Sequence, residues 1–479
     1  MKYNAISFHG TRNGLAAQNG PLVRKAEDMV PISRRNMLYL ATASALVRPS
    51  TSHTSASQAP SDNRTLGLYK YLEDTVPLLL RPAVDSFPYP SVSPSLPGRE
   101  YSASLWDWDT LWSCRGLLAY ANARRDAVFK AKLLEHCRGS FANFFAHQAS
   151  DGRLPILMTS ANPDLLGSTA PAHPTHTNQA KPVFAQLALL IVKEGGDTKW
   201  LVPYFNGILR SYEAWERNNL ASCGLFVWGD DVAIGNDNDP TTFGRPFFSS
   251  ANLLLNCLFY ADLLAAADLA RKLQRAADAE RLQRKAEALG DRIRELCWDP
   301  RDQFFYTVDV QCTDHRAELI PQIKPGMRMS WQTLPLRLQT FTGFLPLWCG
   351  VATPQQAREL IDRNYLADER LRCKSGVRSL SRLETMYSLE FSSNPSNWLG
   401  PVWIIANYLV WKGLERYGYA GQASDLAQKT ISLLSNDIAR NGSMNEYYHP
   451  DTGAPLSHKG FMDWNLLVNE MVRPGILKD

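Results

Sequence analysis

Two carboxylic acids in this 479-residue chain stand out because each lies in a loop rich in amide or aromatic residues. Asp237 lies in the stretch IGNDNDPTTF, residues 234–243, and Glu446 leads into the turn sequence HPDTG. A protonated carboxyl and an ionised one, held on either side of a bond, can act as general acid and general base. Hydrolysis of a glycosidic bond uses such a pair. Acids are common in loops, so the two residues alone do not establish this chemistry.

The stretch around Asp237 has two other interpretations. A calcium-binding EF-hand loop needs glycine at its sixth position and glutamate at its twelfth. Counted from Asp237, those positions hold Thr242 and Phe248, which excludes an EF-hand but leaves an irregular calcium site open. Asp239 is followed directly by Pro240, and its simplest interpretation is an ordinary turn residue.

The segment LWDWDTLW, residues 105–112, places acids beside indole rings. Asp109 precedes a helical pattern, so we expect its side chain to cap that helix. Asp107 lies between two tryptophans, which suits a sugar: the carboxylate accepts hydroxyl protons while an indole stacks on the C–H face. Core packing is the alternative for one or two of the three tryptophans of this segment, Trp106, Trp108 and Trp112.

The segment HPTHTNQAKPVF, residues 173–184, contains two histidines, His173 and His176, that suggest a metal site. The proline between them disrupts a regular helix, and the pattern HExxH does not occur. We therefore expect a solvated loop and no metal ion. Gln179 and Lys181 come just before a strongly apolar helical pattern and can face a pocket.

Helical patterns dominate the chain after residue 64. The clearest covers residues 279–298, whose apolar side chains fall on one stripe, as in an outer amphipathic helix. The segments that start at Asn252 and Val183 are apolar nearly all round, as in buried helices. Other helices are expected to begin near Thr110, Ala127, Trp200, Ser330, Pro354, Ser381, Pro401, Ala423 and Phe461.

The alternation of buried and amphipathic helices predicts two concentric layers in a single all-α domain, residues 64–479. Strand patterns are confined to short pieces such as residues 304–310. In the segment NWLGPVWIIANY, we expect Gly400 and Pro401 to open a helix whose first turns hold Trp403 and Asn407.

The charge of the chain is concentrated in its first part. The chain holds 51 Lys and Arg against 47 Asp and Glu, and residues 1–59 account for seven of the bases and two of the acids. The remainder therefore has 44 bases and 45 acids. Because no basic patch or stripe is visible, we expect no nucleic-acid partner.

Residues 1–59 read as a leader. Arg34 and Arg35 precede an apolar run, residues 37–47, that is too short to span a bilayer. The pattern resembles a twin-arginine export signal followed by a Ser/Thr/Ala-rich spacer, and translation starting at Met29 would shorten the segment before the pair. We therefore predict export to the periplasm or the exterior, without a membrane anchor. A chance arginine pair is the alternative and would leave the protein in the cytoplasm.

The eight cysteines form no CxxC pair, which argues against a zinc ribbon. Four of them lie in helical patterns and are expected to be buried thiols: Cys114, Cys137, Cys257 and Cys297. The sequence does not indicate any disulfide pairing.

The order of the motifs WDWDTLW, GNDNDP, NWLGPVWIIANYLVWKGLERYG and NEYYHPDTG with FMDWN resembles family 63 glycoside hydrolases. The resemblance covers residues 64–479 and is greatest to the compact mannosylglycerate and glucosylglycerate hydrolase branch, with family 37 trehalases as more distant relatives. It implies an (α/α)6 barrel, in agreement with the two predicted layers. It also implies an inverting mechanism without a cofactor, in which Asp237 is the general acid and Glu446 the general base.

The resemblance and the aromatic segments together predict the residues that bind the sugar. These are Trp106, Asp107, Trp108, Gln179, Lys181, Tyr387, Trp398, Gly400, Trp403, Tyr447 and Trp464. Three positions depart from the family pattern: Leu399 replaces an Arg or Gln, Asn465 follows Trp464 in place of Thr, and Asp239-Pro240 follows the acid loop. These departures concern the choice of substrate more than the reaction.

The expected function is inverting hydrolysis of an α-linked glucoside or mannoside of a small saccharide, with the two carboxyls roughly 6.5–9.5 Å apart to admit a water. One alternative is hydrolysis of mannosylglycerate or glucosylglycerate, which requires a cation for the glycerate carboxylate; Arg378 and Arg382 are candidates.

Another alternative, of a different class, is a carbohydrate-binding barrel that has lost its catalytic activity. The oligomeric state is not indicated by the sequence.

Overall fold

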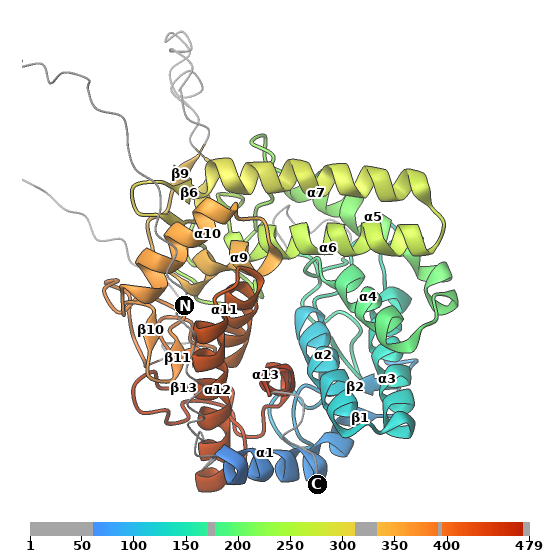
Figure 1. Ribbon diagram of the computed structural model, residues 1–479. Helices are drawn as coiled ribbons and strands as arrows, with labels where there is room; N and C mark the ends of the chain where they lie inside the picture. The colour runs from blue at the N-terminus through green and yellow to red at the C-terminus, as the bar shows by residue number, and fades with distance from the viewer. Residues whose placement is uncertain (1–60, 171–177, 312–332, 391–394, 473–479) are drawn as a thin grey trace, which may run out of the picture. The chain divides into compact units, whose positions relative to one another are not determined.

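The computed structural model describes residues 61–170, 178–311, 333–390 and 395–472, all of which belong to one unit, Gln58–Asp479 (Figure 1). Three predictions lie outside these residues: the leader, the loop with His173 and His176, and the helix expected near Ser330. Cys312 also lies outside them.

Six helical segments of the described chain form a closed ring. In order they are α2 (Asp107–Arg124), α4 (Phe184–Gly195), α6 (Leu253–Lys272), α9 (Leu345–Cys349), α11 (Ile404–Arg416) and η5 (Asp463–Leu467) continued by α13 (Val468–Met471). Each segment contacts the next, and η5 contacts α2, which closes the ring. Their side chains are mostly apolar and mostly buried, which is why these segments can occupy the interior.

Six other helices alternate with the ring segments along the chain. They are α1 (Ser61–Thr75), α3 (Ala127–Ala146), α5 (Val202–Asn219), α7 (Ala276–Leu296), α10 (Pro354–Leu360) and α12 (Ala420–Asn441). Figure 1 shows α7 running beside α6 and α3 beside α2. In α7 the apolar stripe is buried and the charges face outward, as the sequence predicts. The alternation of inner and outer helices confirms the all-α (α/α)6 barrel.

Side chains at several helix starts explain the helix boundaries. Asn252 caps α6 by accepting a hydrogen bond from the backbone N–H of Leu254, and Asp126 caps α3 in the same way. The start of α2 differs from the prediction. This helix begins at Asp107, its capping position is Trp106, and Asp109 does not cap it.

Two predicted helix starts are wrong. No helix begins near Ser381. The segment forms separate turns, in which Glu384 donates to the carbonyl of Ser381 and Tyr387 to that of Glu384, and Ser388 then donates to the distant carbonyl of Leu399. The helix expected at Pro401 begins later, at Ile404, because the residues before it form a short strand.

Short antiparallel strands connect the helices. They are β1 (Leu80–Arg81), β2 (Ser91–Val92), β3 (Ser104–Trp106), β4 (Leu157–Thr159), β5 (Ser250–Ala251), β6 (Trp298–Asp299), β7 (Phe304–Phe305), β8 (Val308–Asp309), β9 (Leu334–Pro335), β10 (Arg372–Cys373), β11 (Gly376–Val377), β12 (Val402–Trp403) and β13 (Tyr447–Tyr448). Four further helical turns are η1 (Val76–Leu79), η2 (Lys199–Leu201), η3 (Phe341–Phe344) and η4 (Ile361–Leu366). The pair β12–β13 sets Trp403 opposite Tyr447, so the segment before α11 lies beside Glu446.

The core contains every cysteine of the described residues as a free, buried thiol, including the four predicted ones. By length and composition, α6 is the one helix among the described residues that could cross a membrane. It lies in the inner ring and most of its side chains are buried, as in the core helix of a barrel.

Candidate active site

A cavity with an accessible volume of about 50 Å³ brings Asp237 and Glu446 together. Its lining residues are Tyr101, Trp106, Trp108, Asp109, Lys181, Ala233, Gly235, Asp237, Ser396, Glu446, Phe461 and Trp464. These residues lie in the first turns of α2 and η5 or in the segments that connect to the starts of α2, α4, α6, α11 and η5. The cavity is thus built by the segments that lead into the inner helices.

Glu446 is buried, and both of its carboxylate oxygens accept hydrogen bonds. The hydroxyl of Tyr101 donates to Oε1 over 3.4 Å, and Nδ1 of His458 donates to Oε2 in a short bond. Burial raises the pKa of Glu446, the bond from His458 partly offsets this, and the charge of nearby Asp237 raises it further. The same bond raises the pKa of His458. An imidazolium next to the carboxylate favours its ionised form, the form that a general base needs.

Neither Tyr101 nor His458 is singled out by the sequence. His458 lies 12 residues after Glu446, beyond a turn, and returns because the backbone N–H of Glu446 bonds to the carbonyl of Ser457. A histidine shortly after a candidate base is the one signal that the sequence offers for this contact.

Asp237 is half-buried and lies between two asparagines whose side chains hold the loop. Asn236 donates to the carboxylate of Asp239, and Asn238 accepts a 2.6 Å bond from the backbone N–H of Trp398. The flanking residues therefore tie the loop to the segment before α11. Asp237 itself lines the cavity.

Asp239 is a structural residue of the same loop. One of its oxygens accepts bonds from the backbone and the hydroxyl of Thr241, both over 2.8 Å, and the other accepts from Asn236 and Asn252. The interpretation of Asp239 as a turn residue is thus confirmed. Its occupied oxygens leave little for a calcium ion, and the described residues contain no cluster of three potential metal ligands.

Tryptophans form the walls of the cavity. Trp106 is half-buried, while Trp108 and Trp464 are almost fully buried, with ring centres 5.6 Å apart. The indole N–H of Trp464 has no hydrogen-bond partner among the described residues. This arrangement offers faces for a sugar ring and a donor for one of its hydroxyls.

The remaining predicted aromatic residues lie behind this wall and do not line the cavity. Trp398 and Trp403 stack face to face with centres 3.9 Å apart, and the hydroxyl of Tyr447 donates to the carbonyl of Pro395. Tyr387 packs against Gly400, whose φ of 144° favours glycine and where a methyl group would lie 2.5 Å from the tyrosine ring. Trp398 and Trp403 support the wall by packing against Trp464.

Asp107 is also behind the wall, contrary to the prediction that it holds sugar hydroxyls. It is fully buried and forms an ion pair with Lys181, whose Nζ lies 3.0 Å from Oδ1. The backbone N–H of Lys181 donates to Oδ2 over 2.7 Å. Lys181 does line the cavity, as predicted. Gln179 is buried without lining the cavity, and its Nε2 has no partner among the described residues.

Asp109 takes the place at the cavity that the sequence assigns to Asp107. Burial raises the pKa of Asp109 to about 7, although a bond from Asp463 lowers it in part. Burial and the neighbouring Asp109 raise the pKa of Asp463 well above its usual range, and Ser113 donates to it. Because ionising both buried carboxyls is disfavoured, the pair keeps one shared proton to a higher pH than a free carboxyl does.

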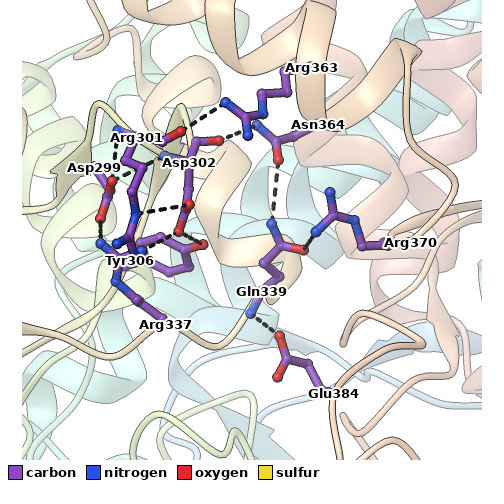
Figure 2. A network of polar contacts seen from close by, with 10 residues as sticks. All are labelled: Asp299, Arg301, Asp302, Tyr306, Arg337, Gln339, Arg363, Asn364, Arg370 and Glu384. Carbon is purple, nitrogen blue, oxygen red and sulfur yellow. Dashed lines mark hydrogen bonds and ion pairs between the residues drawn. The ribbon is translucent and has the colours of Figure 1, made fainter.

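A second, larger polar cavity, with an accessible volume of about 190 Å³, lies elsewhere, and Figure 2 shows the polar network around it. Its acids are paired: Arg337 binds both Asp302 and Asp299, and Glu384 accepts the backbone N–H of Gln339. Figure 2 shows these side chains closed on one another by hydrogen bonds and ion pairs. Asp302 and Glu384 both line this cavity, but each accepts hydrogen bonds or ion pairs from the network, so we interpret the network as structural.

The two arginines considered for a glycerate carboxylate do not line the cavity. Arg378 is buried and donates to Asp451 and to the carbonyls of Glu369 and Arg372. Arg382 is exposed. In the described residues the cation at the cavity wall is Lys181, together with His458 on the base.

Comparisons with known proteins identify the family. Residues 105–462 match the family of mannosylglycerate hydrolase MGH1-like glycoside hydrolase domains. The chain is 34% identical to the mannosylglycerate hydrolase of Thermus thermophilus over 139 residues, which are 28% of this chain and 31% of that protein. It is 27% identical to a probable trehalase of Eremothecium gossypii over 173 residues, 35% of this chain and 20% of the other. The matched segments thus span about a third or less of these relatives.

Solved structures share the fold. The family 63 mannosylglycerate hydrolase from Thermus thermophilus in complex with glucose has a TM-score of 0.59 at 18% identity, covering 86% of this chain and 100% of that one. Neutral trehalase from Saccharomyces cerevisiae has a TM-score of 0.57 at 16% identity, covering 81% and 74%. Because the family match extends over most of the sequence, the chain belongs to the family of mannosylglycerate hydrolase MGH1-like glycoside hydrolases.

Proposed function

We propose that the protein hydrolyses an α-linked glucoside or mannoside of a small saccharide with inversion, using Asp237 as general acid and Glu446 as general base. The observation that carries the proposal is one cavity in which both carboxyls meet between indole walls. The hydrogen bonds of Tyr101 and His458 to Glu446 support the role of base, since donors favour an ionised carboxylate.

The reaction needs one proton transfer on each side of the sugar. Asp237, protonated, donates to the glycosidic oxygen as the bond to the anomeric carbon breaks. Glu446 takes a proton from a water that attacks the same carbon from the opposite face. The products are the free aglycone and a sugar of inverted configuration. Afterwards, Glu446 loses its proton and Asp237 regains one from solvent.

The walls orient the sugar. Trp106 and Trp464 offer indole surfaces, and the free N–H of Trp464 can bind a hydroxyl. Asp109, whose pKa lies near neutrality, can accept hydrogen bonds from sugar hydroxyls. Lys181 has little left to offer a ligand, because Asp107 and the carbonyl of Ala233 occupy its ammonium group.

The size of the cavity favours a small substrate. Its accessible volume of about 50 Å³ is small beside the roughly 300–1,000 Å³ typical of ligand pockets, so the space favours a small sugar over a long chain. The second candidate is a glycoside of glycerate, which the similarity to a mannosylglycerate hydrolase favours. That substrate requires a cation free to hold its carboxylate.

Turnover of a substrate panel tests the proposal: α-glucosides, α-mannosides, trehalose, mannosylglycerate and glucosylglycerate. Proton NMR of the first sugar released should show the β-anomer from an α-glycoside. Release of the α-anomer would establish retention and contradict the mechanism. Binding of sugars without turnover of any would favour a barrel that has lost catalysis.

For its location, we propose export through the twin-arginine-like leader, on the pattern of Arg34, Arg35 and the apolar run after them. Cell fractionation should find the protein outside the cytoplasm, and a variant with both arginines changed to lysine should stay inside. Identical distribution of the two forms would contradict export by this signal.

A further inference from the structure

Lys181 and Asp107 form an ion pair that the hydrolytic step itself does not use. Their side chains are 1% and 0% exposed, which is unusual for charged residues in the wall of a sugar pocket. Asp107 also accepts the backbone N–H groups of Trp108 and Lys181, each over 2.7 Å. These bonds hold the carboxylate of Asp107 in the first turn of α2, and the ion pair holds the ammonium group of Lys181 next to it.

The remaining contact of Lys181 leads to the loop of the general acid. Its Nζ donates a 2.8 Å hydrogen bond to the carbonyl of Ala233, four residues before Asp237. Its aliphatic stem touches the same loop at Gly235, where a methyl group would lie 3.0 Å from Cε of Lys181. One side chain thus holds the backbone at two points just before the acid.

The loop needs such support because its backbone is bent. Ala233 has a φ of 54° and Gly235 a φ of 98°, in the left-handed region that residues other than glycine rarely adopt. Asn178 secures the part further upstream, by donating to the carbonyls of Asp230 and Val232 and accepting from Gly229. Asn178 and Lys181, in the segment that precedes α4, therefore hold the backbone of the segment that carries Asp237.

We propose that Lys181, held by Asp107, positions the general acid Asp237 by fixing the backbone of Ala233 and Gly235. The inference rests on the proposed function, in which Asp237 protonates the leaving oxygen. Lys181 is a positioning residue: it acts through the loop and ties it to α2, which also supplies Trp108 and Asp109. The geometry of proton donation then depends on Lys181, while sugar binding depends on it less.

The dependence of the rate on the leaving group separates this role from a general structural one. A glycosyl fluoride needs little help from an acid, whereas an O-glycoside needs a proton on its leaving oxygen. A misplaced general acid should therefore slow hydrolysis of the O-glycoside but not of the fluoride. A general loss of structure in the barrel should slow hydrolysis of both substrates by a similar factor.

The test compares kcat/KM on the O-glycoside that the wild type hydrolyses and on the fluoride of the same sugar. Lys181→Met removes the bond to Ala233 but leaves a buried carboxylate. The double variant Asp107→Asn with Lys181→Met removes the bond without leaving an unpaired charge. We expect kcat on the O-glycoside to fall roughly 10- to 100-fold in the double variant, with KM and the fluoride rate within about threefold of wild type.

Two controls complete the design. Arg337→Met removes a cation from the network of Figure 2, away from the cavity, and should leave the ratio of the two rates unchanged. Asp237→Asn tests the proposed function separately: if it hydrolyses the O-glycoside normally, the acid is misassigned whatever Lys181 does. Equal losses on both substrates, no loss on either, or unfolding of both Lys181 variants by circular dichroism would overturn the positioning role.

Discussion

At the scale of single residues, the catalytic assignment depends on how Glu446 is held. Two donors on its oxygens leave it ionised while it is buried, and burial raises its pKa above the ordinary value of 4.5. The acidic limb of the pH–rate profile should therefore lie above pH 4.5, because protonation of Glu446 removes the base.

His458→Asn should move that limb to higher pH. His458 lowers the pKa of Glu446, so its removal lets the carboxylate take up a proton at a higher pH. We expect the acidic limb of kcat/KM to shift by about half to one pH unit, with activity recovered above the shifted limb, up to the pH at which Asp237 loses its proton. A uniform fall in rate with an unmoved limb would show that His458 is only structural. His449→Asn, at a histidine that does not line the cavity, is the matched control.

Particular residues show what the sequence could predict about the site. Asp237, Glu446, Trp106 and Trp464 are identifiable because they lie in aromatic loops in a recognisable order. The exchange of roles between Asp107 and Asp109 is not identifiable, because it depends on Lys181, which approaches Asp107 from 74 residues away. The partner of a buried charge is a tertiary fact that local pattern does not contain.

At the scale of elements, contacts between α2 and η5 couple the stability of the barrel to pH. Asp109 and Asp463 both have pKa values raised by burial, Asp109 to about 7. A carboxyl whose pKa is higher in the folded state binds more protons when folded, so stability is greatest below the unfolded pKa of about 3.9 and falls as pH rises toward the folded value.

Asp463→Asn should reduce this loss. An asparagine amide can donate to Asp109 and accept from Ser113 without adding a second acid to the buried pair. The difference in unfolding free energy between variant and wild type should therefore shift in favour of the variant between pH 4 and pH 8, as measured by urea denaturation. Asp268→Asn, at a half-exposed surface carboxyl, is the control and should show no such trend. A difference independent of pH would contradict the shared-proton interpretation.

The helices could be predicted where the buried side chains recur with the period of an α-helix. The apolar stripe of α7 and the apolar surface of α6 indicate an outer and an inner helix from sequence alone. The prediction failed near Ser381 and Pro401, where backbone donors pair with distant segments or a two-residue strand precedes the helix. Such pairings override local propensity, and a single sequence does not reveal them.

At the scale of the whole barrel, the site exists only because the ring closes. Its lining residues extend from Tyr101 to Trp464, and each comes from a segment that leads into an inner helix. Alternation of inner and outer helices places these segments together. The predicted two layers therefore implied a common location for the loops, while the cavity's small volume and polar contacts required the folded structure.

The central claim is that Asp237 donates the proton in this cavity. The measurement that tests it most directly is kcat/KM of Asp237→Asn relative to wild type, on the O-glycoside and on the fluoride of the same sugar. We expect a loss of about 10²- to 10⁴-fold on the O-glycoside and a fluoride rate within roughly tenfold of wild type, because fluoride leaves without the acid. Near-normal turnover of the O-glycoside by Asp237→Asn would contradict it.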